Sequence, residues 1–386
     1  MKVAIVSYGH LDSIIPQSKA LSGHANVALF MIFAMNKLRE SVLSLEGENV
    51  VPGFQNAEVT SNILGTDIEN FIEGRFQPHF FVYQNLKLKS MANFRLSRQL
   101  SKELRKYDIV HFNGQDGTLL QLLPLLLGIK KIFTVHDFVR HTGEGKKNLM
   151  DRFNPWLVNS GKHLVIQNKE DFNRLTDDDP NQTHIHFVPF GPLDIFEAFE
   201  SKNDMGLPHS ELLFFGRISE YKGIEYLLEA LEIIEAKGKK INTLIAGSGD
   251  YDFGKEKIKN KKHITLINRF IGNDELVELI QKTTLVVCPY TDASQSGVAM
   301  TSYVFNKPVI ATAVGGFPDV VKEGVTGWLV PPKNAKKLAV AIEHAMDNRP
   351  ALRQAGQNIM NLKERGDFSW REIGKSLYNV YETILK

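Results

Sequence analysis

The sequence predicts an α/β protein made of two successive domains, each containing a parallel sheet. Its 386 residues exceed the usual size of one domain. Short apolar runs alternate with longer amphipathic runs along the chain, which is typical of strands separated by helices. The alternation breaks at residues 189–203, where PFGPLDIFEAFESKND contains proline, glycine and charges. We therefore expect a linker there and a second domain over residues 204–370.

In the first half, the apolar runs predict five strands and two helices. The strands are expected at residues 3–7, 108–112, 132–136, 163–166 and 184–188, and the helices at 92–105 and 118–127. In the second half, the same patterns predict six strands and six helices. The strands are expected at residues 212–216, 242–246, 264–267, 284–289, 308–312 and 327–330, and the helices at 224–237, 274–282, 296–305, 335–347, 351–364 and 370–385.

Composition excludes several classes of protein. A net charge of +2 is too small to indicate nucleic-acid binding by the whole chain. The single cysteine, Cys288, rules out a disulfide framework and a cysteine-based zinc site, and it favours a reducing compartment. The apolar runs are shorter than the roughly 20 residues of a membrane span, and the N-terminus reads as a strand. We expect a cytoplasmic protein that can also bind the inner face of the membrane.

Two cations follow a predicted strand in the segment FFGRISEYKG. Gly216 allows close approach of the backbone, Arg217 leaves the strand end, and Lys222 is expected at the start of the next helix. Two cations and the N-terminus of a helix together suit a diphosphate. The alternative is a pair of solvated surface cations at a turn.

A second loop that could bind an anion follows the strand at 284–289. The segment YTDASQSGV is rich in small polar residues; Ser296 can cap the next helix and Gly297 can expose backbone N–H groups. The alternative is an ordinary capped helix, which explains the cap but not the small polar residues.

Taken together, these segments resemble family 4 of the retaining glycosyltransferases, which have the GT-B architecture of two Rossmann-like domains. The resemblance covers FFGRISEYKGIEYLLEAL, NTLIAGSGD, VVCPYTDASQSG, KPVIATAVGGFPDVVKEGVTGWLVPP and the final FSWREIGKSLYNVYETIL. In the first half, only TVHD and FVPFGPLDIF resemble the family. The resemblance implies that the C-terminal domain binds a nucleotide-sugar donor. It also implies that the N-terminal domain, residues 1–195 plus helix 371–386, binds the acceptor.

The resemblance also implies roles for individual residues. Arg217 and Lys222 would hold the donor diphosphate, and the backbone at Ser296, Gly297 and Val298 would contact phosphate. Further candidates are Gly9 in the N-terminal glycine loop, Arg269 and Phe270 at the nucleotide base, and His136 beside the sugar.

The sequence departs from the family where two glutamates, E-x7-E, are usual. The first position falls on Ala293, with Asp292 beside it, and the second falls on Thr301. Because the second glutamate normally holds the ribose, Thr301 would make a weaker contact.

The segment HDFVRHTGE offers further polar groups on the acceptor side. We expect His141 and Glu144 either to line the acceptor site or to belong to an ordinary polar loop. The spacing matches no metal-binding motif, so no metal and no other cofactor is expected. The resemblance implies retention by front-face displacement, in which the departing phosphate oxygen helps to take the acceptor's proton.

A basic segment at residues 87–106 has two interpretations. Its lysines and arginines alternate with apolar residues, so it could bind anionic lipid or simply be a solvated helix face.

The leading hypothesis is transfer of a sugar from a UDP- or GDP-sugar to a glycan or lipid-linked acceptor, as in cell-envelope polysaccharide or glycolipid synthesis. The alternatives are a catalytically weak nucleotide-sugar-binding protein and a GT-B nucleotide-sugar epimerase. A nicotinamide dehydrogenase is disfavoured because MKVAIVSYGHLD lacks GxGxxG after its strand.

Overall fold

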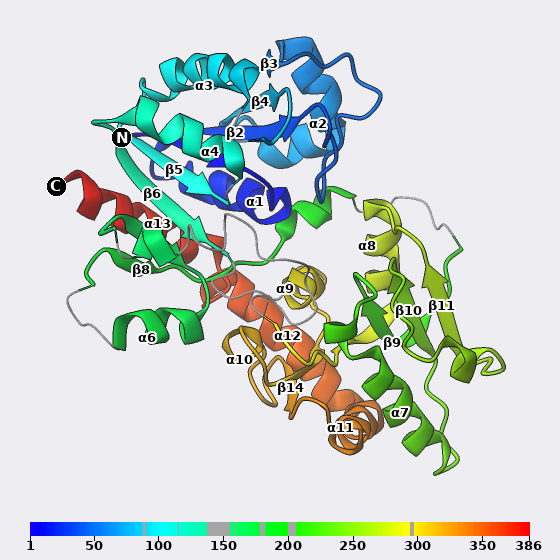
Figure 1. Ribbon diagram of the computed structural model, residues 1–386. Helices are drawn as coiled ribbons and strands as arrows, with labels where there is room; N and C mark the ends of the chain where they lie inside the picture. The colour runs from blue at the N-terminus through cyan, green and yellow to red at the C-terminus, as the bar shows by residue number, and fades with distance from the viewer. Residues whose placement is uncertain are drawn as a thin grey trace. The chain divides into compact units, whose positions relative to one another are not determined.

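A computed structural model of the chain describes residues 1–87, 90–114, 116–136, 155–158, 160–177, 182–199, 206–293 and 297–386. The chain forms two compact units (Figure 1). The N-terminal unit combines the described residues up to Ala198 with Asp367–Lys386, and the C-terminal unit contains the described residues from Phe199 to Gly366. Each unit is an α/β layer structure with a mainly parallel sheet, as predicted from the sequence.

The N-terminal unit has an eight-stranded sheet in the order β3-β4-β2-β1-β5-β6-β7-β8. All neighbouring strands are parallel except β3 and β4. The strands are β1 (Lys2–Ser7), β2 (Asn26–Ala34), β3 (Gly53–Phe54), β4 (Gln77–Tyr83), β5 (Ile109–Asn113), β6 (Lys130–Val135), β7 (His163–Ile166) and β8 (Ile185–Phe187). The sequence patterns had not assigned β2, β3 and β4, although β2 carries one of the longest apolar runs of the chain.

Helices cover this sheet, and several begin at side-chain caps. Asn56 and Ser90 accept hydrogen bonds from the backbone N–H groups of Val59 and Asn93, which fixes the starts of α2 and α3. The helical segments are α1 (Leu11–Leu21), α2 (Ala57–Ile72), α3 (Met91–Leu104), α4 (Gly117–Leu122), η1 (Leu123–Leu126), α6 (Lys169–Asp177), η2 (Asp194–Phe199) and α13 (Trp370–Leu385).

The last helix, α13, packs against α1 within the N-terminal unit. Gly374 makes the contact close, because a Cβ there would lie 3.0 Å from the backbone of Ala20. The Tyr381 hydroxyl lies 2.6 Å from Nδ1 of His111 in β5, and burial lowers the pKa of His111 to about 3. The histidine is therefore neutral and forms part of a buried polar link between helix and sheet.

The described residues of the segment expected to be a linker form a packed structure. Residues Asp194–Phe199 form the 3₁₀ helix η2, in which Ile195 and Phe196 are buried. Trp370 donates a hydrogen bond to the Pro192 carbonyl at 3.0 Å. The proline and glycine that predicted a linker therefore lie in a segment that contacts α13.

The C-terminal unit has a six-stranded parallel sheet in the order β11-β10-β9-β12-β13-β14. Its strands are β9 (Ser210–Phe215), β10 (Thr243–Gly247), β11 (Ile264–Asn268), β12 (Thr283–Cys288), β13 (Val309–Thr312) and β14 (Gly327–Val330). Its helical segments are η3 (Glu220–Lys222), α7 (Ile224–Glu235), η4 (Lys255–Ile258), α8 (Asn273–Gln281), α9 (Gly297–Val304), α10 (Phe317–Val320), α11 (Ala335–Asp347) and α12 (Arg349–Arg365).

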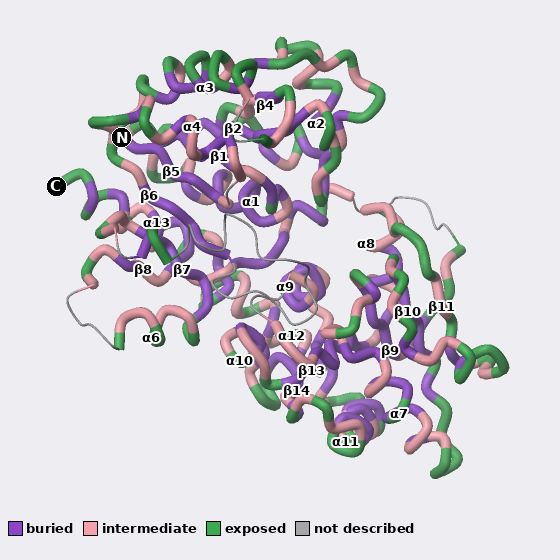
Figure 2. Tube along the Cα trace, viewed as in Figure 1, coloured by how far each residue is buried: buried purple, intermediate pink, exposed green. Residues whose placement is uncertain are grey.

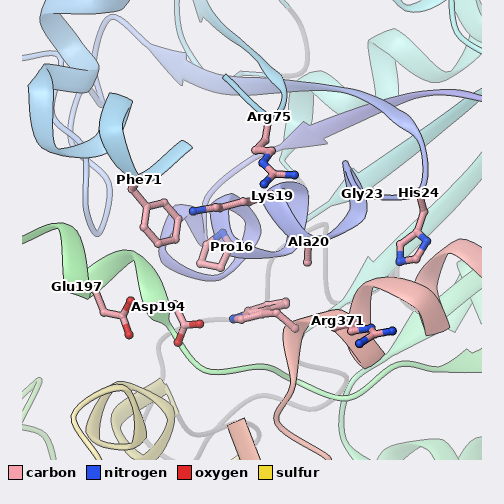
Figure 3. A pocket seen from close by; sticks show the side chains of 11 residues that line it. Pro16, Lys19, Ala20, Gly23, His24, Phe71, Arg75, Asp194, Glu197 and Arg371 are labelled. Carbon is pink, nitrogen blue, oxygen red and sulfur yellow. The ribbon is translucent and has the colours of Figure 1, made fainter. Parts of the chain in front are cut away.

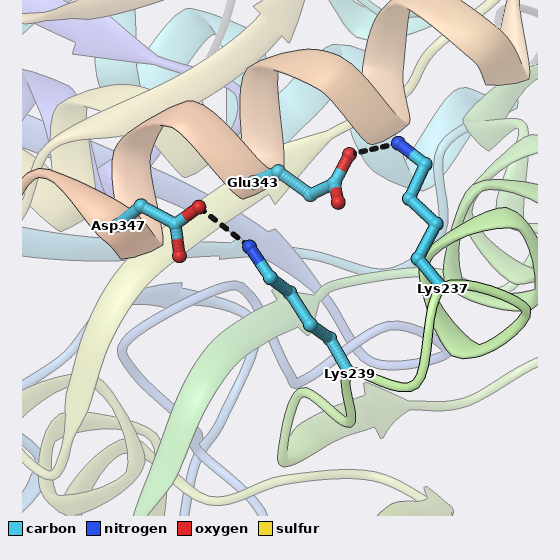
Figure 4. A network of polar contacts seen from close by, with 4 residues as sticks. All are labelled: Lys237, Lys239, Glu343 and Asp347. Atoms are coloured by element: carbon cyan, nitrogen blue, oxygen red, sulfur yellow. Dashed lines mark hydrogen bonds and ion pairs between the residues drawn. The ribbon is translucent and has the colours of Figure 1, made fainter.

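Exposed ion pairs join the end of α7 to α11 on the surface of this unit (Figure 4). Lys237 pairs with Glu343 at 2.5 Å and Lys239 pairs with Asp347 at 2.6 Å. Because at least one partner in each pair is well exposed, these bridges contribute little stability. The apolar faces of α7 and α11 provide the main contact.

The cores consist mainly of strands buried on both faces, as expected for parallel sheets covered by helices (Figure 2). In the described part of the chain, no helix is both long enough and apolar enough to span a bilayer.

Candidate functional site

The C-terminal sheet has a topological switch point between β9 and β12. From β9 the chain continues to β10 and β11 on one side, and it later returns to form β12, β13 and β14 on the other. In open α/β sheets, ligands bind outside the carboxyl ends of the strands at such a point. The two segments singled out in the sequence follow β9 and β12, so the switch point brings them together.

Direct contacts connect the segments after β9 and β12. The Thr291 N–H donates to the Tyr221 carbonyl at 2.8 Å. A Cβ on Gly223 would lie 2.1 Å from the Pro289 carbonyl oxygen, so only glycine allows this approach. A Cβ on Gly216 would lie 3.7 Å from Cγ2 of Val298, near the start of α9.

Arg217 and Lys222 provide the positive charge at this edge. Arg217 is exposed, and within the described residues it has no hydrogen bond or ion pair. Lys222 is half-buried at the end of η3 rather than within the helix α7. Burial lowers the pKa of Lys222 to about 8, and the neighbouring charge of Arg217 acts in the same direction. The two positive charges therefore repel each other, and an anion bound by both side chains would offset this repulsion.

The residues around the start of α9 differ in what they can contribute. Gly297 and Val298 form its first turn, and Asp292 is partly exposed before it. Thr301 is 3 % exposed, and its hydroxyl donates to the Gly297 carbonyl at 2.8 Å. Because its proton is used within its own helix, the Thr301 hydroxyl could meet a ribose hydroxyl only as an acceptor, which fits the weaker contact expected of it.

Arg269 and Phe270 follow β11, two strands from the switch point. Arg269 forms a bidentate ion pair with Glu275, with both distances 2.7 Å. Phe270 is 58 % exposed. An exposed aromatic ring beside a fixed guanidinium can stack on a planar base.

The N-terminal sheet has its own switch point, between β1 and β5. His136 directly follows β6 and is buried, and its Nε2 lies 2.8 Å from Oδ1 of Asn113 at the end of β5. The Asn113 amide donates to Ser7 Oγ at 3.1 Å, and Ser7 Oγ donates to the Gly9 carbonyl at 2.5 Å. These directions make Asn113 Oδ1 an acceptor, so Nε2 of His136 carries a proton and donates it to Asn113.

His10, which follows Gly9 in the expected glycine loop, completes this group. Its ring stacks on His136 with 3.9 Å between centroids. The backbone of His10 has φ 54, an unusual left-handed conformation for a residue other than glycine. Gly9, at φ 141, precedes it and turns the chain into α1. The turn at Gly9, the residue expected in the glycine loop, therefore positions an imidazole.

Three of the predicted residues, Ser296, His141 and Glu144, lie outside the described residues. Among the residues that the structure describes, no group of three or more His, Cys, Asp or Glu side chains could hold a metal ion.

The N-terminal unit also contains a pocket of about 480 Å³ beneath α1 (Figure 3). Lys19 lies over the Phe71 ring at 4.5 Å and pairs with Glu73 at 3.4 Å. Besides Lys19 and Phe71, the pocket is lined by Pro16, Ala20, Gly23, His24, Arg75, Asp194, Glu197, Trp370 and Arg371. Several of these residues precede strands β2 and β4, so the pocket lies away from the carboxyl edge that carries His136.

Comparisons with known proteins agree with this arrangement. Residues 196–361 match the family described as "Glycosyl transferases group 1". The chain is 27 % identical over 304 residues to a D-inositol 3-phosphate glycosyltransferase of Corynebacterium diphtheriae, covering 72 % of this chain and 70 % of the relative. It is 26 % identical over 309 residues to the alpha-D-kanosaminyltransferase of Streptomyces kanamyceticus, covering 74 % and 80 %.

Among solved structures, HepE of Anabaena in complex with UDP superposes with a TM-score of 0.67 at 15 % identity, covering 99 % of this chain and 100 % of HepE. The matches support a glycosyltransferase with the GT-B fold. The two parallel-sheet domains predicted from the sequence are thus confirmed as GT-B domains. Asn113 and His10 are site residues that only the tertiary structure revealed.

Proposed function

We propose that this chain is a retaining glycosyltransferase that moves a sugar from a UDP- or GDP-sugar to a hydroxyl of a glycan or lipid-linked acceptor. The observation that carries the proposal is the meeting of Arg217 and Lys222 at the switch point of the C-terminal sheet. A diphosphate leaving group needs charge neutralisation as its bond to the sugar breaks, and these cations can supply it. The UDP complex of HepE supports a uridine nucleotide as the first candidate donor.

On the acceptor side, we propose that His136 lies beside the sugar and the incoming hydroxyl. Asn113 Oδ1 accepts a hydrogen bond from Nε2 of this histidine and so fixes the orientation of its ring. No side chain is assigned as a nucleophile, in keeping with front-face displacement, in which a donor phosphate oxygen takes the acceptor's proton. Because the cations neutralise the diphosphate, we propose that the reaction needs no metal or other cofactor, and activity should survive EDTA.

Thermal shifts with UDP, GDP, ADP and their sugar conjugates test the donor site, since ligand binding to the native state raises the melting temperature. Arg217→Ala should weaken binding by about 1.5–3 kcal/mol, the range for a hydrogen bond to a charged group. Arg353→Ala is the control, because Arg353 is an exposed arginine of the same unit without a described partner. Equal shifts in wild type and Arg217→Ala would remove the diphosphate assignment.

Product analysis separates transfer from its alternatives. A transferase gives a new glycoside only with acceptor present, and NMR of its anomeric carbon reports retention. An epimerase changes the donor sugar without acceptor, and a weak nucleotide-sugar-binding protein gives a thermal shift but no product.

We also propose that the enzyme works at the inner face of the cell membrane, in envelope polysaccharide or glycolipid synthesis. The support comes from α3, whose residues at positions 91, 94, 95, 98 and 102 form one outward stripe at 100° per residue. Met91 is 80 % exposed and Phe94 is 40 % exposed. Arg95, Arg98 and Lys102 are exposed and form no ion pair within the described residues. Apolar side chains that can insert, next to cations that can bind headgroups, suit an anionic lipid surface.

Sedimentation with vesicles of phosphatidylcholine, with and without phosphatidylglycerol, tests this contact. We expect binding only to the anionic vesicles and its loss when Arg95, Arg98 and Lys102 are changed to Glu, since each cation contributes about 1 kcal/mol. The control changes Lys333, Lys336 and Lys337 to Glu, which alters net charge equally in the other unit. Equal losses in the two triple variants would show a general charge effect instead of a contact through α3.

A further inference from the structure

Lys222 lacks the acidic partner that a half-buried cation usually has. Among the described residues, no carboxylate forms an ion pair with it. Its ammonium instead lies 3.7 Å from the centroid of the Tyr290 ring and 4.9 Å from that of Tyr221. Both distances are well within the range of a cation–π interaction.

The Tyr290 ring is held rigidly beneath the ammonium. Tyr290 is 2 % exposed, and it meets Phe317 edge to face at 5.1 Å and Tyr221 at 6.2 Å. Its carbonyl accepts a hydrogen bond from Thr312 Oγ1 at 2.6 Å. Strand β13, helix α10 and segment η3 therefore all fix the ring, so its position does not depend on the lysine.

An aromatic partner has a different consequence from an acidic one. A carboxylate would cancel the charge of Lys222 and would compete with an incoming diphosphate. The face of an aromatic ring attracts the ammonium through its quadrupole but carries no net charge. The lysine is thus oriented before the ligand arrives, while its full charge stays available to an anion.

We propose that Tyr290 is a positioning residue of the donor site, which orients the Lys222 ammonium toward the diphosphate through the cation–π contact. This inference rests on the proposed function, because it assumes that Lys222 binds the donor. It assigns no chemical step to Tyr290. Tyr290 acts only through the lysine, so its effect on donor affinity must depend on the presence of Lys222.

A double-mutant cycle tests this dependence by measuring the Kd of UDP or GDP, whichever gives the larger thermal shift. Tyr290→Phe keeps the ring and should bind within about twofold of wild type. Tyr290→Leu should weaken binding by about 2- to 30-fold, the change that a cation–π contact of this range implies. In the Lys222→Ala background, Tyr290→Leu should have no further effect.

The outcomes separate the two proposals. If the wild type binds neither nucleotide, the proposed function fails. If it binds, but Tyr290→Leu weakens binding equally with and without Lys222, Tyr290 is only a structural residue and the inference is overturned. Tyr303→Leu is the matched control, because Tyr303 is an equally buried tyrosine of the same unit that bonds to Thr326 and the Val320 carbonyl.

A second series covers the case in which Tyr290→Leu fails to fold. Stepwise fluorinated phenylalanines at position 290 keep the shape of the ring but weaken its quadrupole. Affinity should fall progressively with fluorination, and a constant affinity across the series would overturn the inference.

Discussion

Lys222→Arg should remove the pH dependence of donor binding above neutrality. Burial lowers the pKa of Lys222 to about 8, and a diphosphate binds the protonated form. Affinity in the wild type should therefore be full below pH 8 and fall as the pH rises through it. With that pKa, about 90 % of Lys222 is charged at pH 7 and about 10 % at pH 9, so the Kd should rise about tenfold between them.

The other groups near Lys222 do not titrate in this range. Burial raises the pKa of Cys288 to about 12 and raises the pKa of Tyr290 well above its usual value. A phosphate group loses its second proton near pH 6, so the terminal phosphate of a nucleoside diphosphate is mostly doubly charged by pH 7. Lys222 is thus the one group among these that changes charge.

Isothermal titration with UDP or GDP from pH 7 to pH 9 measures the effect. In Lys222→Arg the guanidinium keeps its charge, so the Kd should stay constant within about twofold even if the absolute affinity is lower. A wild-type Kd that does not change with pH, or an equal rise in Lys222→Arg, would refute the assignment of the pH dependence to Lys222.

Two further predictions test the backbone and the N-terminal unit. Asn113→Leu should lower kcat/KM about tenfold because it removes the acceptor that fixes the His136 tautomer. Asn113→Asp should move the acidic limb of the pH profile to higher pH, since a carboxylate favours the imidazolium form, and an unmoved limb would contradict the role of Asn113. Gly223→Ala should lower the free energy of unfolding by more than 2 kcal/mol, roughly, because its Cβ would lie 2.1 Å from the Pro289 carbonyl oxygen. Gly238→Ala has a similar φ and open space around it, so calorimetry of the two variants separates the clash from the strain; equal losses would argue against the clash.

The sequence alone was sufficient to predict those helices and strands that a pattern of neighbouring residues reveals. The strands of the C-terminal unit were predicted within about two residues because each is a short apolar run bounded by polar or glycine residues. Arg217 and Lys222 were also selected locally, since the segment that carries them follows a strand and precedes a helix. In contrast, β4 was missed because it begins with Gln-Pro-His instead of an apolar run, and β2 was missed because its long apolar run is also compatible with a buried helix.

The site itself needed the tertiary structure. The sequence determined the two α/β domains and the candidate cations, because propensity and periodicity act over a few neighbouring residues. It could not show that Tyr290 lies under Lys222, that His10 stacks on His136, or that Asn113 fixes a tautomer, since each pair is joined by the order of strands in a sheet. Strand order is decided by long-range packing, which leaves no mark on the residues between the strands.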